Sequence, residues 1–122
     1  MAADTRQFAG KVGLVTGAGS GMGRAAALAM AREGADLLLV GRREALLAEV
    51  AREVEALGAR AAIHAGDVTR GETCRNAVAR CVAELGGLDL AFNNAGGHGN
   101  PAPIDAVDEA EEDHYLALNL SA

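Results

Sequence analysis

A glycine-rich segment, KVGLVTGAGSGMGR over Lys11–Arg24, constrains the fold of this chain more than any other feature. It begins with a short apolar run, continues through Gly17, Gly19, Gly21 and Gly23, and leads into an alanine-rich helical pattern. The segment therefore predicts a strand that turns into a helix through a glycine loop. Glycine allows positive φ and a close approach of the backbone to a ligand, and the free N–H groups of the first helical turn favour a phosphate there.

The rest of the chain repeats this alternation of strand and helix. The expected elements are a strand over 11–16, a helix over 22–33, a strand over 36–41, a helix over 44–57, a strand over 60–65, a helix that ends at 86–87, a strand over 88–93 and a last helix from about 108. Strict alternation with short loops predicts an α/β fold, a Rossmann-like doubly wound parallel sheet of four strands in the order 3-2-1-4 with crossover helices. This order places the glycine loop and the residues after the fourth strand in one cleft.

Length and charge narrow the class of protein. With 122 residues the chain has room for one domain with a modest core. Its net charge of −6 argues against nucleic acid or an anionic membrane as a partner. The sequence has no apolar run of about 18 residues, and its start lacks the hydrophobic region of a signal peptide. We therefore expect a cytoplasmic protein with no nucleic-acid and no membrane partner.

Two cysteines are expected to belong to the core. Cys74 and Cys81 would lie about 10.5 Å apart along a helix, too far for a disulfide between them. With Val78, Val82 and Leu85 they follow the spacing of one buried helical face. The three histidines show no ligand spacing with these thiols, so no metal site is predicted.

The glycine loop has the pattern TGxxxGxG, formed by Thr16, Gly17, Gly21 and Gly23. A plain tight turn remains an alternative for the loop taken alone. Met22 stands where the third glycine of GxGxxG would fall, and the Gly-Lys-Ser/Thr ending of a nucleotide-triphosphate loop is absent. With this pattern the sequence resembles the short-chain dehydrogenase/reductase family, in which TGxxxGxG is the cofactor loop.

The resemblance extends to three further motifs. Asp67-Val68 is similar to the family's adenine pocket, although an Asp in this place could instead cap a helix. The tetrapeptide Asn93-Asn94-Ala95-Gly96 is the family's NNAG, which braces the sheet and contacts the cofactor ribose. Asn119 matches the asparagine that holds a water in the family's proton relay, where a plain helical polar residue is the alternative. The implied cofactor-binding residues are Gly17, Ser20, Gly21, Met22, Gly23, Arg42, Arg43, Asp67, Val68, Asn93, Ala95 and Gly96.

The residues that follow the second strand predict the preferred cofactor. An NAD site usually has an acidic residue there, which accepts from the ribose 2′-OH and repels a 2′-phosphate. This chain has Gly41 followed by Arg42 and Arg43. We therefore expect NADP(H) to be preferred, with NAD(H) as the alternative, and Arg42 to be the direct phosphate contact. Two solvated arginines at a helix start are the competing interpretation.

The resemblance covers about the first half of a family member. The family's catalytic Ser and its Tyr-x-x-x-Lys are not found: Tyr115 is the only tyrosine, and Asn119 stands four residues after it. Residues 1–122 are therefore expected to form a single dinucleotide-binding domain that lacks the carboxy-terminal catalytic half. The completed protein would transfer hydride between NAD(P) and a carbonyl or alcohol substrate, as a homo-oligomer. A non-catalytic dinucleotide-binding module and an unproductive truncated fragment are the alternatives.

Overall fold

The computed structural model describes residues 6–19 and 21–94. The elements are β1 (Val12–Thr16), α1 (Gly21–Arg32), β2 (Asp36–Gly41), α2 (Glu44–Ala56), β3 (Ala61–Ala65), α3 (Gly71–Arg80), the π-helical segment η1 (Cys81–Leu85) and β4 (Leu90–Asn93). The predicted alternation of strands and helices is thereby confirmed, with small differences at the ends of elements. The helix expected from about Asp108 lies outside the described residues.

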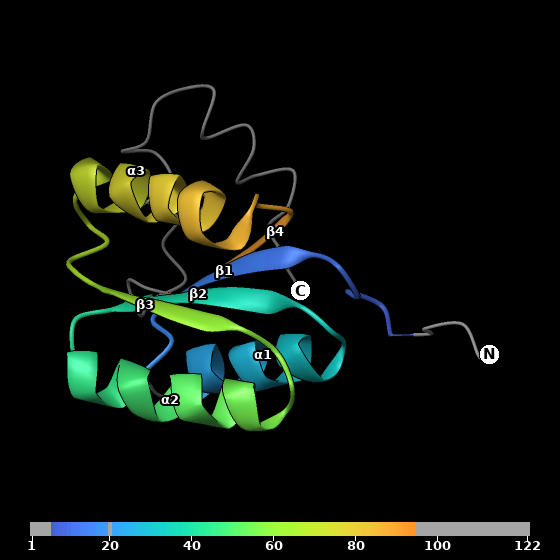
Figure 1. Ribbon diagram of the computed structural model, residues 1–122. Helices are drawn as coiled ribbons and strands as arrows, with labels where there is room; N and C mark the ends of the chain where they lie inside the picture. The colour runs from blue at the N-terminus through green and yellow to red at the C-terminus, as the bar shows by residue number, and fades with distance from the viewer. Residues whose placement is uncertain (1–5, 20, 95–122) are drawn as a thin grey trace.

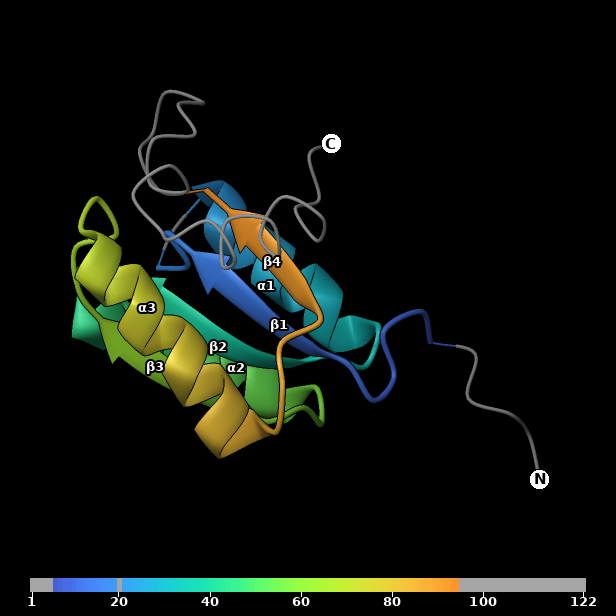
Figure 2. The same cartoon turned by 90° about the horizontal axis from the view of Figure 1, so that it is seen from above.

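The four strands form one parallel sheet in the order β3-β2-β1-β4. Two helices, α1 and α2, cover one face of this sheet, and α3 covers the other (Figure 1). Seen from above, β1 lies between β2 and β4, and β3 forms the edge next to β2 (Figure 2). This arrangement confirms the predicted doubly wound sheet. It also brings the carboxyl ends of β1, β2 and β3 to the same edge of the molecule.

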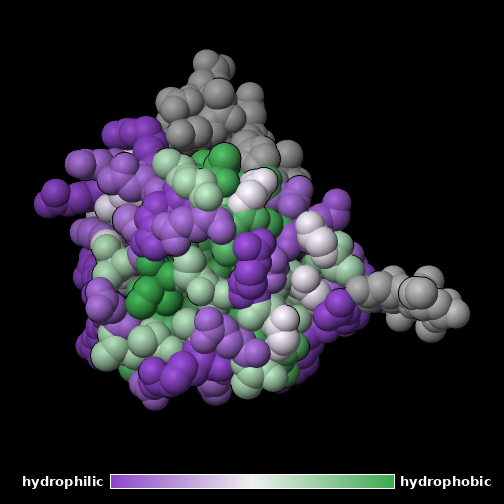
Figure 3. Space-filling model, in the orientation of Figure 1, coloured by the Kyte–Doolittle hydropathy of each residue, from purple (hydrophilic) through white to green (hydrophobic). Residues whose placement is uncertain are grey.

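The sheet has an apolar core on each face, because successive side chains of a strand point to opposite faces. Leu14 and Leu38 pack with α3, whereas Val15 and Leu39 pack with α1 and α2. All four side chains are fully buried. This explains why β1 and β2 have continuous apolar runs rather than an alternating pattern. On the surface drawn in Figure 3, hydrophilic residues lie between the hydrophobic ones.

The fourth strand begins later than the sequence predicts. It starts at Leu90 instead of Leu88. The reason is that one of the two hydrogen bonds between Asp89 and β1 is made by the Asp89 side chain and not by its backbone. The backbone N–H of Asp89 donates to the carbonyl of Val12 at 2.8 Å, and the carboxylate of Asp89 accepts from the N–H of Val12 at 2.9 Å. A side chain thus replaces a backbone acceptor at the first rung between the two strands.

The two cysteines lie in the core as predicted, but Val82 does not. Cys74 and Cys81 are free thiols with exposed fractions of 5% and 0%. Val82 was expected on the same buried face and is 56% exposed. Cys81 and Val82 belong to the π-helical segment, so the α-helical spacing that put both on one face does not apply, and Val82 turns outward while Cys81 packs inward.

Both thiols are expected to react slowly while the protein is folded. Burial raises the pKa of the Cys81 thiol from 9.0 to about 12, which lowers the fraction of reactive thiolate at neutral pH by about 1,000-fold. Labelling with an aromatic disulfide reagent at pH 8 should therefore be slow in native buffer and fast in denaturant. Rapid native labelling of both cysteines would contradict their placement in the core.

Candidate functional site

A cavity of about 600 Å³ opens at the carboxyl ends of β1, β2 and β3. Its lining residues are Gly17, Gly19, Gly41, Arg42, Arg43, Leu46, Leu47, Gly66, Asp67, Val68 and Thr69. Open α/β sheets bind their ligands outside the carboxyl ends of the strands. The cavity therefore has the position expected of a ligand site, and it combines three segments that are far apart in the sequence.

The glycine loop connects β1 to α1, and two of its glycines, Gly17 and Gly19, line the cavity. Gly17 and Gly21 have φ values of +63° and +60°, which disfavour residues with a side chain. The N–H of Ala18 donates to the carbonyl of Val40 at 3.1 Å, which ties the loop to β2. A Cβ atom on Gly23 would overlap the carbonyl oxygen of Gly17 and lie 2.6 Å from its carbonyl carbon. The first turn of α1 can approach the loop this closely only because residue 23 is glycine.

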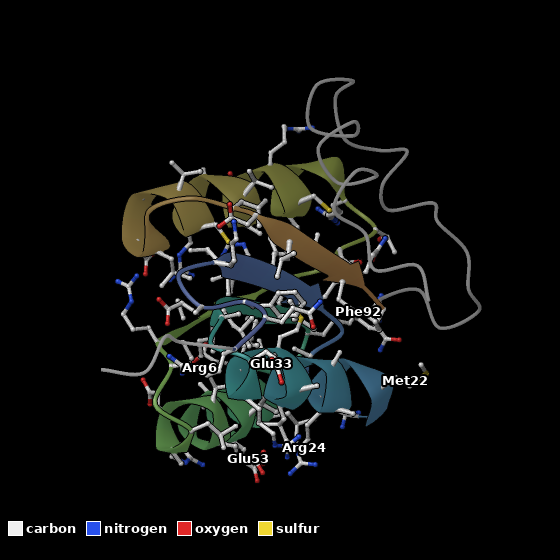
Figure 4. The ribbon with its side chains drawn as sticks, turned by 90° about the vertical axis from the view of Figure 1, so that its right-hand side faces the viewer. Arg6, Met22, Arg24, Glu33, Glu53 and Phe92 are labelled. Carbon is white, nitrogen blue, oxygen red and sulfur yellow. The ribbon has the colours of Figure 1, made fainter. Side chains whose placement is uncertain are left out.

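The start of α1 has the electrostatics of an anion site. Its first turn contains no acidic residue, so that turn carries no carboxylate of its own beside the positive end of the helix dipole. Met22 is 70% exposed and points away from the helix start (Figure 4). Arg24 points instead to α2, where its Nε donates to Oε1 of Glu53 at 2.9 Å (Figure 4). Ser20 lies outside the described residues.

Two arginines follow β2 at the mouth of the cavity. The Arg42 side chain is 74% exposed, and its Nη2 lies 3.5 Å from Oδ1 of Asp67. The carbonyl of Arg43 accepts from the N–H of Leu47 at 3.1 Å and so begins α2. Gly41 packs closely against Leu47, because a Cβ at residue 41 would lie 3.2 Å from a methyl carbon of that side chain. The residues that directly follow β2 are therefore an exposed arginine and a second arginine, with no acidic residue among them.

Asp67 forms a turn with Thr69 and does not cap a helix. Its Oδ1 accepts from the Thr69 backbone N–H at 2.9 Å and from the Thr69 hydroxyl at 2.6 Å. These hydrogen bonds, with a smaller contribution from Arg42, hold the pKa of the Asp67 carboxyl below its ordinary value. The cap of α3 is Arg70, which makes no side-chain capping bond. The alternative interpretation of Asp67 as an N-cap is therefore wrong.

Val68 forms the apolar wall next to this carboxylate. It is 7% exposed and packs in the core on the α3 side of the sheet. Its carbonyl accepts a hydrogen bond from Sγ of Cys74 at 3.5 Å. The predicted pair Asp67-Val68 thus presents a charged acceptor and an apolar surface side by side.

Hydrogen bonds join the end of β4 to the end of β1. The buried Thr16 hydroxyl donates to Oδ1 of Asn93 at 2.8 Å and accepts from the backbone N–H of Asn94 at 2.9 Å. In the sheet Asn93 pairs with Thr16, the residue directly before Gly17. That Asn93 shares a cleft with the glycine loop stays a prediction. Ala95, Gly96 and Asn119 lie outside the described residues.

Sequence reasoning missed several residues of the cavity. Thr69 and Leu46 line it, and neither was singled out from the sequence. Thr69 had a detectable signal, because Asp followed two residues later by Thr favours a turn in which the carboxylate accepts from the backbone. Leu46 had no such signal, since its spacing only indicated the apolar face of α2.

Neither a metal cluster nor a membrane-spanning helix is found in the part of the chain that the structure describes. It contains no group of three or more His, Cys, Asp or Glu side chains that could hold a metal ion. No helix within 6–94 has the length and apolar character needed to cross a bilayer.

The sequence was compared with known proteins. The family model described as short chain dehydrogenase matches residues 11–122. General stress protein 39 of Bacillus subtilis is 49% identical over 88 residues, which cover 71% of this chain and 31% of that protein. The A-factor type gamma-butyrolactone 1'-reductase of Streptomyces virginiae is 39% identical over 110 residues, 90% of this chain and 43% of that protein. The chain thus spans less than half the length of these relatives.

Solved structures share the fold. L-sorbose reductase from Gluconobacter frateurii, complexed with NADPH and L-sorbose, is 37% identical with a TM-score of 0.71, covering 88% of this chain and 41% of that one. Carveol dehydrogenase from Mycobacterium avium, in complex with NAD, is 36% identical with a TM-score of 0.69, covering 75% of this chain and 38% of that one. The sheet order, the glycine loop and the family match agree, and the chain belongs to the short-chain dehydrogenase family of oxidoreductases, with their NAD(P)-binding fold.

Proposed function

We propose that the protein carrying this chain is an NADP(H)-preferring oxidoreductase that transfers hydride between the nicotinamide and a carbonyl or alcohol substrate. Residues 1–122 would supply a single dinucleotide-binding domain. The family match supports this reaction class, and the cavity has the size and position of a nucleotide site. One structural neighbour is complexed with NADPH and another with NAD, so the choice between the cofactors rests on this chain's own residues.

The proposed placement of the cofactor follows the geometry of the cavity. The pyrophosphate would lie at the start of α1, where the backbone N–H groups face an open, positively polarised end. The base would lie between the Asp67 carboxylate and the apolar Val68, and Arg42 and Arg43 would take the 2′-phosphate. By family resemblance the remaining contacts come from Ser20, Gly21, Met22, Gly23, Asn93, Ala95 and Gly96, and Asn119 would support the proton relay.

The observation that carries the preference for NADP(H) is the position of Arg42. Its exposed ion pair with Asp67 contributes only about 0–1 kcal/mol. A charge-assisted hydrogen bond to a phosphate is worth about 1.5–3 kcal/mol. The ligand phosphate is therefore expected to compete with Asp67 for the guanidinium, and residue 41, as glycine, contributes no carboxylate of its own.

Replacing Arg42 with alanine is expected to lower the affinity for NADPH about 10- to 100-fold and to leave the affinity for NADH nearly unchanged. The measurement is a fluorescence titration of the protein with each reduced cofactor. Arg32→Ala is the matched control, because Arg32 is exposed in the last turn of α1, at the end away from the cavity. Equal affinities for the two cofactors in the unmodified protein, or an unchanged preference in Arg42→Ala, would refute the assignment.

A further inference from the structure

The donors that surround the Asp67 carboxylate in the described part of the chain all lie at one of its two oxygens, Oδ1. Three donors converge on its Oδ1: the Thr69 N–H at 2.9 Å, the Thr69 hydroxyl at 2.6 Å and Nη2 of Arg42 at 3.5 Å. Within the described part of the chain, no contact of this kind is made by Oδ2. The second oxygen is therefore available to a donor in the cavity that Asp67 lines.

Thr69 contributes both the shortest hydrogen bond and the fixed geometry. Arg42 is mostly exposed and, by the proposed function, moves to the 2′-phosphate when the ligand binds. The Thr69 backbone N–H and hydroxyl then remain as the groups that set the rotation of the carboxylate. They also keep the pKa of the carboxyl low, so that at neutral pH it only accepts hydrogen bonds.

We propose that Thr69 is a positioning residue for base selectivity: by holding Oδ1 of Asp67 it presents Oδ2 to an exocyclic amine and so selects an amino-purine over an oxo-purine. A carboxylate that only accepts can bind the N–H of adenine, whereas the carbonyl of hypoxanthine in the same place offers no hydrogen. The inference rests on the proposed dinucleotide site and adds a specificity role for a residue outside the glycine loop and the arginine pair.

A purely structural role for Thr69 makes a different prediction. The Asp67–Arg70 turn, closed by the Arg70 N–H and the Asp67 carbonyl at 3.0 Å, leads into α3. If Thr69 only stabilised this turn, its loss would lower the melting temperature and weaken every nucleotide alike. A positioning role instead changes the ratio of affinities for two bases.

The experiment compares NADPH with deamino-NADPH, in which hypoxanthine replaces adenine, on the full polypeptide that carries this chain. Dissociation constants are measured for the unmodified protein, Thr69→Val, Thr69→Ser and the control Thr73→Val. Valine removes the hydroxyl and keeps the shape, whereas serine keeps the hydroxyl. Thr73 is the neighbouring threonine in the first turn of α3 and is not among the residues that line the cavity.

We expect the unmodified protein to prefer NADPH by about 10-fold. Thr69→Val should lose most of this preference, through weaker binding of NADPH alone, and Thr69→Ser and Thr73→Val should keep it. Thr69→Ala is measured in the same way, so that the comparison stands if the valine variant does not fold.

Two results would overturn the inference without touching the proposed function. They are an equal loss of affinity for both ligands in Thr69→Val and Thr69→Ala, and an unmodified protein that binds both ligands equally. Failure of the unmodified protein to bind NADPH at all would instead refute the dinucleotide site and the inference with it.

Discussion

Gly23→Ala is expected to destabilise the fold by about 3 kcal/mol and to weaken NADPH binding by about 100-fold or more. The added Cβ would overlap the carbonyl oxygen of Gly17, and it would also lie 3.1 Å from the Cα of Ala18. All of these atoms belong to the backbone, so no side-chain rotation relieves the clash. The first turn of α1 must therefore move away from the loop, and the proposed pyrophosphate site moves with it.

Whether Gly23→Ala lowers or raises the free energy of unfolding shows whether the steric clash or helix propensity dominates. Alanine in a helix is ordinarily about 1 kcal/mol more favourable than glycine, so propensity alone predicts stabilisation. Gly87→Ala is a control for the added Cβ alone, because Gly87 lies outside the helices, a Cβ there would have no neighbour within 4 Å, and its φ is not in the left-handed region. Urea unfolding of both variants gives the two free energies. A Gly23→Ala protein as stable as Gly87→Ala would show that the close contact is not required.

A second large effect concerns catalysis by residues 1–122 expressed on their own. We expect this polypeptide to show no measurable reduction of aldehydes or ketones, even where it binds NADPH. Hydride transfer to a carbonyl leaves an alkoxide that must gain a proton, and in the family a tyrosine supplies it with help from a lysine four residues on. General acid catalysis of this kind is typically worth about 10²- to 10⁴-fold. Tyr115 is followed four residues later by Asn119, so these residues contain no such donor pair.

The measurement follows NADPH oxidation with a panel of aldehydes, ketones and quinones, after cofactor binding has been verified by fluorescence. A complete short-chain reductase assayed in parallel shows that the panel reports activity. Sustained turnover that is lost in Asn119→Ala would show that these residues are catalytically sufficient and that the proposed division of the domain is wrong.

The layout of the sheet could be predicted because its determinants are local and repeated. Apolar runs such as Leu37–Val40 indicate strands that are buried on both faces, and the alternation with helices then restricts the strand order. The start of β4 could not be predicted, because it depends on the Asp89 carboxylate meeting Val12, a residue 77 positions away. Val82 was misplaced because the expected spacing was that of an α-helix, whereas Cys81–Leu85 form a π-helical segment.

The site was predictable to the extent that its residues follow the ends of strands. Gly17, Arg42 and Asp67 each follow a strand directly or within two residues, and parallel strands bring such residues to one edge of the sheet. Asn93 follows a strand as well, but its partner is the Thr16 hydroxyl. Side-chain partners of this kind depend on three-dimensional contacts, and the role of Thr69 in holding Asp67 emerged only with the hydrogen-bond geometry.

A crystal structure of the protein with NADPH bound tests the proposed site most directly. We expect the pyrophosphate on the backbone N–H groups at the start of α1, the adenine amine within hydrogen-bond distance of Asp67, and the 2′-phosphate within hydrogen-bond distance of Arg42. An adenine bound away from Asp67 and Val68 would contradict this placement, and so would a 2′-phosphate that makes no contact with Arg42.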